Sequence, residues 1–481
     1  PETGQTFQND GTMEAAGTGG LAFSGGTFVN NTSIDVLTGS KLDLNNGTTL
    51  QGGTLMTAGS GVINVNGTTA SDVVLDGITN QGSVAQFNSK EATVVNGLTN
   101  DGTWQIFSAG STTGLEFSGT QTLGGTGSIV MNNNTWGRLL ASGGTVTNGA
   151  NHTIQGGGTI EGSWLNLGTL DVGGSNIFRA TSGLMTNDGA IQTSGSAKFE
   201  VETSVGGTGT WTAAGGTIQV ESTGAITNAG LVAVQSGGMV AVQSGGSVQT
   251  TSLTQTGGVV DVVGNLSAGG VDVSGGQLGV QSGGAVQATS LTLQSGGAID
   301  VGGTLNVGAG GMNIIGGQLS SIGGAVNLTG AGQLLSNSGF MQLANTAVTL
   351  PGGASLNNLG GGTIQMGGGS IGGTVHNAGL MQLTNTVGMN TLNIASTGTV
   401  DLQAGFLQLQ NDMQIQGRLI NTISNLAKVQ HDSFHSLILN LIGMSLMGGM
   451  GGYGGGMDPM VIAIAMIPVA AILFGIFGCL G

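Results

Sequence analysis

The sequence is poor in proline and in charge. Only 4 of its 481 residues are Pro and 6% are charged, against roughly a quarter charged in an average soluble domain. The scarcity of Pro and the absence of a Gly-X-Y period exclude collagen, and 38% hydrophobic residues disfavour a disordered chain. The 7 Lys and Arg are outnumbered by 23 Asp and Glu. No basic cluster is available to neutralise phosphates, so we expect no nucleic-acid partner.

Cysteine is also scarce, and a targeting segment is missing from the sequence. Cys479 is the single cysteine and lies in an apolar segment, so no disulfide framework holds this chain together and we interpret it as a small buried apolar residue. The sequence begins at Pro1 with neither an initiator Met nor a signal sequence. We therefore expect a mature or truncated form of an exported protein.

What the chain has in abundance is glycine, in repeating units. VQSGGSVQTTSLT at residues 242–254 returns as VQSGGAVQATSLT at 280–292, an offset of 38 residues. GITNQG at 77–82 is followed by GLTNDG at 97–102, an offset of 20. The repeating unit is therefore about 20 residues long, and the larger offset corresponds to two units.

Apolar residues alternate within each unit, as in Leu170 and Val172 or Ile218 and Val220. A period of two predicts short strands with one buried face, and the Gly-Gly and Asn-Gly pairs between them predict sharp turns. We predict an all-β fold, a parallel β-helix (β-solenoid) of about 20-residue coils over residues 1–417, with roughly 21 coils. Stacked charges would repel one another at every coil, which explains their scarcity.

Asparagine recurs in N-x-G turns, where it suits the turn conformation. Stacked in register, amide side chains also form hydrogen-bonded ladders. The residues predicted to form such turns or ladders are Asn80, Asn100, Asn187, Asn228 and Asn377.

The run VTNGANHTIQGGGTIEGSWLNLGTLDVGG at residues 146–174 resembles the repeats of autotransporter passenger and haemagglutinin-like β-helical proteins of bacterial surfaces. The resemblance covers residues 1–415 and implies export, a cell-surface or extracellular location and, often, adhesion. Two features of such proteins are missing from this sequence. The residues after 415 lack the alternating segments of a β-barrel translocator, and no Pro-Glu-Pro sorting motif is present.

The composition changes near Gly417. Residues 418–447 contain little Gly and have apolar residues at helical spacing, so we predict a helix that is amphipathic and then apolar. Residues 448–459 form a Gly-rich hinge, and residues 460–481 are apolar enough to cross a bilayer as a helix. We leave open a membrane anchor in lipid, an assembly interface between subunits, and a removable sorting signal. The side chains expected in the anchor or interface are Met460, Ile464, Ile467, Ile472, Phe474 and Phe477.

Few residues suit catalysis or metal binding. Glu200 and Glu202 share a strand face, a spacing compatible with glycoside hydrolysis but more typical of a solvated face. His431 and His435 lie one helical turn apart beside Asp432 but lack a third ligand. We predict no enzymatic activity, no cofactor and no metal site.

Two further patterns suggest ligands only weakly. The GGVVD, GGVD and GGAID segments that end at Asp261, Asp272 and Asp300 share some features with calcium-binding repeats but lack their nine-residue period. Exposed tryptophans would provide carbohydrate platforms, whereas packing in the core is the more common role. The four tryptophans are Trp104, Trp136, Trp164 and Trp211.

Three classes of function remain. We favour a non-enzymatic structural subunit that assembles with copies of itself into a cell-surface fibre or coat, because low charge removes an obstacle to lateral association. An adhesin that binds glycans or surfaces through one face is the alternative. A polysaccharide-acting enzyme is the distant alternative, because residues 199–417 contain no Lys or Arg to build its site.

Overall fold

The computed structural model describes residues 4–132, 136–402 and 407–409. The chain forms two compact units, unit 1 (residues 1–269) and unit 2 (residues 270–481). Strands account for all regular structure in the described residues except one short 3-10 helix, η1 (Ala70–Asp72). The predicted helix at 418–447, the hinge at 448–459 and the apolar segment at 460–481 lie outside the described residues.

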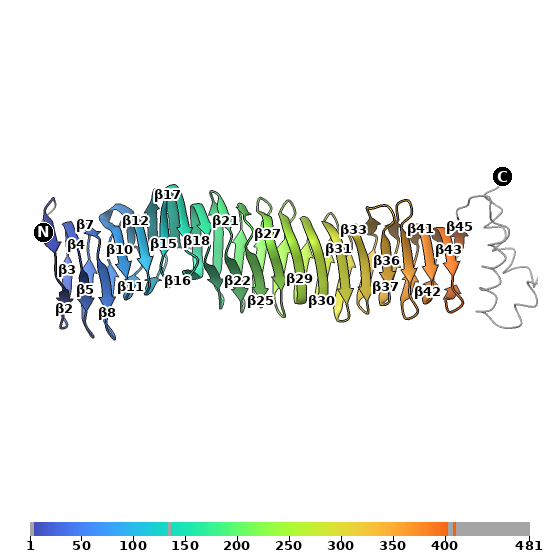
Figure 1. Ribbon diagram of the computed structural model, residues 1–481, viewed down its shortest axis with the longest axis horizontal. Helices are drawn as coiled ribbons and strands as arrows, with labels where there is room; N and C mark the ends of the chain where they lie inside the picture. The colour runs from blue at the N-terminus through green and yellow to red at the C-terminus, as the bar shows by residue number, and fades with distance from the viewer. Residues whose placement is uncertain (1–3, 133–135, 403–406, 410–481) are drawn as a thin grey trace, which may run out of the picture. The chain divides into compact units, whose positions relative to one another are not determined.

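Unit 1 is a parallel β-solenoid (Figure 1). In its first turns three strands make one turn, and each strand pairs in parallel with the strand three places later, so that β1 pairs with β4, β2 with β5 and β3 with β6. Farther along, longer strands pair with the strand two places later or with the next one. The first two turns consist of β1 (Thr6–Asn9), β2 (Met13–Ala15), β3 (Leu21–Phe23), β4 (Gly26–Asn30), β5 (Ser33–Val36) and β6 (Lys41–Leu44).

Unit 2 repeats this arrangement of parallel strands. One of its stacks consists of β34 (Gln318–Ile322), β37 (Phe340–Ala344), β40 (Thr363–Met366) and β42 (Leu380–Leu383). The predicted all-β parallel solenoid is therefore confirmed for the described residues, with about 19 turns rather than 21. The predicted number is too high because most turns are longer than 20 residues: Thr6 pairs with Thr27, Phe340 with Thr363 and Thr49 with Val74, whereas a spacing as short as that of Thr153 and Thr169 is rare.

The core is built by alternation along each strand. In β6, Leu42 and Leu44 are fully buried while Lys41 and Asp43 point outward. The same pattern recurs in β19 (Thr169–Val172) and β26 (Thr217–Val220), where the sequence predicts it. Because each strand lies in register on the next, an inward side chain packs on its equivalents in the turns before and after it.

Glycine is required where neighbouring turns approach closely. A Cβ on Gly114 would lie 1.9 Å from the carbonyl oxygen of Arg138 in the adjacent turn. At Gly125 the φ angle is +94° and a Cβ would lie 2.3 Å from the carbonyl oxygen of Asn100. No other residue fits either position without a shift of the backbone, and both positions affect the polar rows described below.

Candidate functional site

A row of buried asparagine amides runs through unit 1, at the ends of strands in successive turns. Each amide nitrogen donates to the oxygen of the next side chain, at 2.7 Å from Asn80 to Asn100, 2.8 Å from Asn148 to Asn166 and 2.7 Å from Asn166 to Asn187. All five side chains are at most 2% exposed. We call Asn80, Asn100, Asn148, Asn166 and Asn187 the asparagine ladder.

His152 joins the two parts of this ladder. In the next turn Thr99 pairs with Gly124, and a Cβ on the following residue, Gly125, would meet the backbone of Asn100, so this turn has no side chain to continue the row. The fully buried imidazole of His152 fills the gap, with Nε2 3.0 Å from Asn100 Nδ2 and Nδ1 2.8 Å from Asn148 Oδ1. Burial lowers the pKa of His152 to about 4, with a small opposing effect from the charge of Asp101.

Of the five asparagines predicted from N-x-G turns, four are buried and hydrogen-bonded to an asparagine of a neighbouring turn. Asn377 belongs to a second row, in unit 2, with Asn337 and Asn358. Asn228 is exposed, with a φ of +61°. It lies within β27 (Ala225–Val234) and has no ladder role, because the register shift between Ile226 and Ala229 turns its side chain outward.

Charged side chains form a second, outward row on unit 1, which we call the charged row. Successive turns pair Glu91, Gly114, Arg138, Thr159, Arg179 and Glu200 in register. The strands involved are β12 (Glu91–Asn100), β14 (Thr113–Ser118), β17 (Gly137–Asn148), β18 (Thr153–Asn166), β20 (Ile177–Ser182) and β23 (Lys198–Val201). Thr159 separates the two arginines, so no like charges are adjacent in this row.

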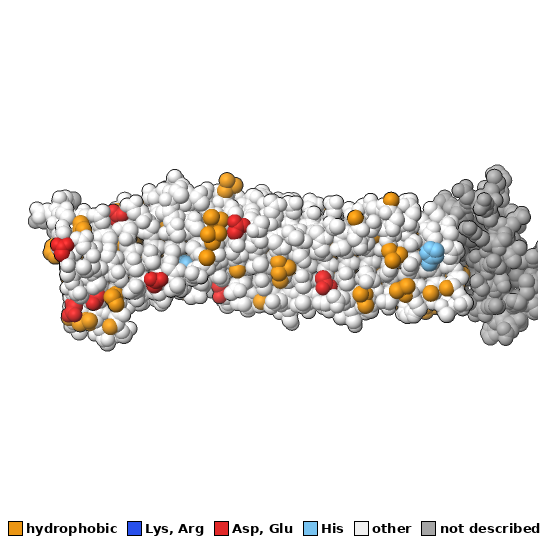
Figure 2. Space-filling view, viewed as in Figure 1, with side chains coloured by type: hydrophobic (Ala, Val, Ile, Leu, Met, Phe, Trp, Pro, Cys, Tyr) orange, Lys and Arg blue, Asp and Glu red, His pale blue; other side chains and the backbone are white. Residues whose placement is uncertain are grey.

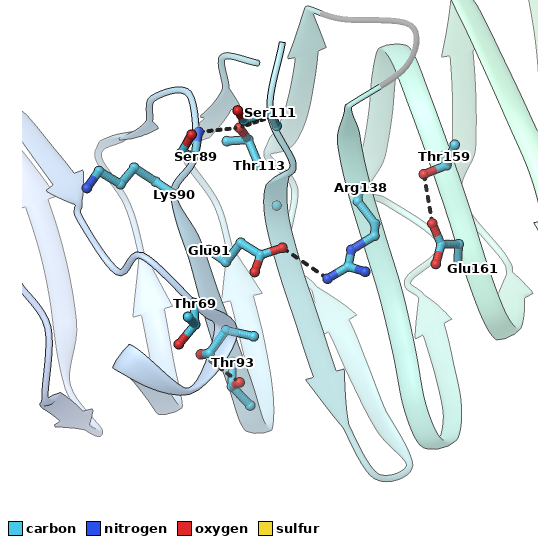
Figure 3. Close-up of polar contacts among 12 residues, drawn as sticks. Thr69, Ser89, Lys90, Glu91, Thr93, Ser111, Thr113, Arg138, Thr159 and Glu161 are labelled. Atoms are coloured by element: carbon cyan, nitrogen blue, oxygen red, sulfur yellow. Dashed lines mark hydrogen bonds and ion pairs between the residues drawn. The ribbon is translucent and has the colours of Figure 1, made fainter. Parts of the chain in front are cut away.

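Arg138 spans two turns to reach an acid. Its Nη2 lies 3.0 Å from Glu91 Oε1, past the strand that carries Gly114 (Figure 3). Gly114 has no side chain in the path of the guanidinium, which permits this contact. Both partners are partly exposed, and such a pair contributes no more than about 1 kcal/mol to stability.

The predicted pair of carboxylates at Glu200 and Glu202 is bridged by a cation. Arg179 Nε lies 2.6 Å from Glu200 Oε2 and 3.5 Å from Glu202 Oε1, and Lys198 Nζ lies 3.4 Å from Glu200 Oε1. Burial raises the pKa of Glu202, the charge of Glu200 adds to the rise, and Arg179 opposes it. A glycosidase holds its substrate between two carboxylates, and here the guanidinium of Arg179 occupies that position.

The surface grooves carry no cluster of acids and bases. A groove of about 420 Å³ in unit 1 is lined mostly by small or polar residues such as Gly77, Asn96 and Thr99, together with the apolar Ile78 and Leu98. One of about 270 Å³ in unit 2 contains the imidazole of His376. Neither groove is lined by Asp, Glu, Lys or Arg.

Metal ligands do not converge in the described part of the chain, where no group of three His, Cys, Asp or Glu could hold an ion. Asp272 accepts a hydrogen bond of 2.8 Å from Gln294 Nε2, and Asp300 accepts one from Gln277 Nε2. These amides therefore bind two of the three carboxylates that the sequence offers for calcium. His431, Asp432 and His435 lie outside the described residues.

Three tryptophans are core residues and one is exposed. Trp104, Trp164 and Trp211 are at most 2% exposed, whereas Trp136 is 43% exposed. Trp104 Nε1 donates to the buried Gln86 Oε1 at 2.8 Å. Trp211 Nε1 has no hydrogen-bond partner among the described residues.

Comparison with known protein families, curated proteins and solved structures found no match. In residues 4–132, 136–402 and 407–409, no helix has the length and apolar character needed to cross a membrane. By its fold, the described part of the chain is a parallel β-solenoid with internal amide ladders.

Proposed function

We propose that this protein is a non-enzymatic, extracellular structural subunit that assembles with copies of itself into a cell-surface fibre or coat. The observation that carries the proposal is an uncharged outward surface on unit 2. There Ser320, Gln342, Gln365 and Gln382 pair in register along four successive turns. We call this row the glutamine face.

The row beside it is also uncharged. It consists of Gln318, Phe340, Thr363 and Leu380, paired in the same register. A flat surface of amides, hydroxyls and apolar groups allows a second copy to approach without bringing like charges together. Amide side chains on both partners supply donors and acceptors for contacts across the interface.

Charge is scarce over the rest of unit 2 as well. Its described residues from 270 to 402 contain no Lys or Arg and three acids, Asp272, Asp300 and Asp401. Asp300 and Asp401 lie at the two ends of the glutamine face, where they pair with Ser320 and Gln382. Most of the surface visible in Figure 2 carries no charged side chain, with hydrophobic side chains scattered over it. Among the described residues of unit 2, the exposed large apolar side chains are Ile315, Ile322, Leu334 and Leu359.

Two added charges test the role of the glutamine face. The variant Gln342→Lys with Gln365→Lys places two cations on adjacent turns of this face, and Thr27→Lys with Thr49→Lys does the same on unit 1. Both variants change the net charge equally. Sedimentation velocity in detergent-free buffer is expected to show loss of assembly for the first and retention for the second. Equal assembly of the two variants would refute the role of this face.

The segment 460–481 is proposed as the anchor or assembly core. This role is separate from the glutamine face, because the paired lysine variants leave the segment intact. A fluorescent probe at Cys479 would distinguish lipid from protein surroundings after reconstitution with vesicles. Quenching by lipid-borne quenchers indicates an anchor, and protection from them in assembled material indicates a protein interface.

Export to a bacterial surface is part of the proposal and rests on the resemblance of residues 146–174 to β-helical passenger repeats. Antibody labelling of intact cells that express the protein is expected to detect it without permeabilisation. Labelling that requires permeabilised cells would contradict the location.

An adhesin that binds surface glycans is the second candidate, favoured by exposed aromatics on unit 1. Trp136 is 43% exposed, and Phe87 is 51% exposed and stacked on Phe107, with ring centroids 5.5 Å apart. Aromatic faces suit the apolar faces of sugar rings. Glycan-array binding that disappears in Trp136→Ala would support this function, and the absence of binding by the native chain would exclude it for the glycans on the array.

A further inference from the structure

One titratable side chain, His152, links the two parts of the asparagine ladder at a position where the chain has no asparagine. In the turn between them, Thr99 pairs with Gly124 and Asn148 pairs with Leu123, so no amide of this turn continues the row. An asparagine at the next residue, Gly125, is blocked, because its Cβ would meet the backbone of Asn100. His152 replaces the missing amide from a turn of the chain four residues after Asn148.

The hydrogen bonds fix the proton on this imidazole. Asn100 Oδ1 accepts from Asn80, so its Nδ2 faces His152 and donates to Nε2. Nδ1 must then carry the proton, because its partner is Asn148 Oδ1, an acceptor. The row accepts only the neutral ring in this tautomer.

Protonation breaks the row at one contact. A proton on Nε2 turns it from an acceptor into a donor that points at the amide N–H of Asn100. Rotating the Asn100 amide would restore that contact but would lose the hydrogen bond from Asn80. At acid pH, two buried N–H donors therefore face each other without an acceptor, whichever way the Asn100 amide is oriented.

Little surrounds His152 that could hold a positive charge. The ring is fully buried, and the charged group that acts on it is Asp101, whose Oδ1 accepts hydrogen bonds from the backbone and hydroxyl of Thr126. The hydrogen-bond partners of the His152 ring are the neutral amides of Asn100 and Asn148. Burial consequently outweighs the attraction of Asp101, and the folded state favours the neutral ring.

We propose that His152 is an acid-sensitive joint in unit 1: its protonation opens the turns between Asn100 and Asn148, while the all-asparagine row of unit 2 stays closed. The row Asn337–Asn358–Asn377 has no titratable member. Acidification would thus loosen one defined region of the solenoid before the rest.

Hydrogen exchange of the full chain tests this, with mass spectrometry at pH 7 and pH 5 and rates corrected for the intrinsic effect of pH. The local opening constant around residues 144–156 is expected to rise on the order of 20-fold, since the open state binds a proton that the closed state excludes. Peptides around 374–383 contain the exposed His376 and serve as the control. They are expected to show no change.

The variant His152→Gln provides the matched comparison. A side-chain amide presents one acceptor and one donor, as the neutral ring does, but does not titrate. The pH response at 144–156 is expected to disappear in this variant. An equal response in both regions of the native chain, or its persistence in His152→Gln, would overturn the proposal. If far-ultraviolet circular dichroism shows that the variant has lost its strands, the comparison within the native chain decides alone.

Discussion

Removal of one amide from the asparagine ladder should destabilise unit 1 strongly. In Asn166→Ala, the amide N–H of Asn148 loses its acceptor and Asn187 Oδ1 loses its donor. Both atoms are buried, and a buried polar group left unsatisfied costs about 1–3 kcal/mol. We expect unit 1 to lose about 3–4 kcal/mol of unfolding free energy at neutral pH.

Urea unfolding followed by tryptophan fluorescence measures this loss in unit 1 alone. All four tryptophans lie within residues 1–269, and three of them are buried. With a slope near 3 kcal/mol per molar urea, the midpoint should fall by roughly 1 M.

The control is Asn228→Gly, which removes an asparagine from an N-x-G turn outside the ladder. Asn228 is exposed with a φ of +61°, a conformation that glycine adopts freely. The unfolding free energy of this variant should differ from that of the native chain by no more than about 0.5 kcal/mol. Equal losses in the two variants would refute the assignment of stability to the buried amide row.

Three further outcomes follow. Trp104→Phe should cost about 1–3 kcal/mol because Gln86 Oε1 loses its buried donor, whereas Trp211→Phe removes an unpaired N–H and should cost less in the same urea assay. Gly114→Ala should lower the unfolding free energy by about 1–3 kcal/mol or more, since the new Cβ meets the Arg138 carbonyl; an unchanged urea midpoint would contradict the close approach. Trypsin has no cleavage site within residues 199–417, so elastase and chymotrypsin provide the informative test of this block. We expect it to resist both proteases, and rapid cleavage by either would contradict compact turns.

The strands and their alternation could be predicted because period two is a local property. Thr169–Val172 and Thr217–Val220 are strands with the inward residues that the sequence indicates. The N-x-G spacing also predicts buried amides, and the same spacing at Asn166, Asn337 and Asn358 could have identified three more members of the rows.

The sequence could not reveal features that depend on register. Asn228 has the N-x-G spacing of the ladder residues, yet a shift between adjacent turns places it outside. His152 acquires its role because the turn between Asn100 and Asn148 carries no amide at this place, with Leu123 opposite Asn148 and Gly124 opposite Thr99. Arg138 reaches Glu91 across two turns because Gly114 lies between them. Each of these contacts requires the exact pairing of turns, which repeat length alone does not determine.

Negative-stain electron microscopy of the native protein in detergent-free buffer tests the proposed assembly most directly. The uncharged glutamine face of unit 2 predicts ordered fibres or sheets, with a lateral spacing that is lost in Gln342→Lys with Gln365→Lys. Uniformly dispersed monomers of the native chain would contradict a structural, self-assembling role.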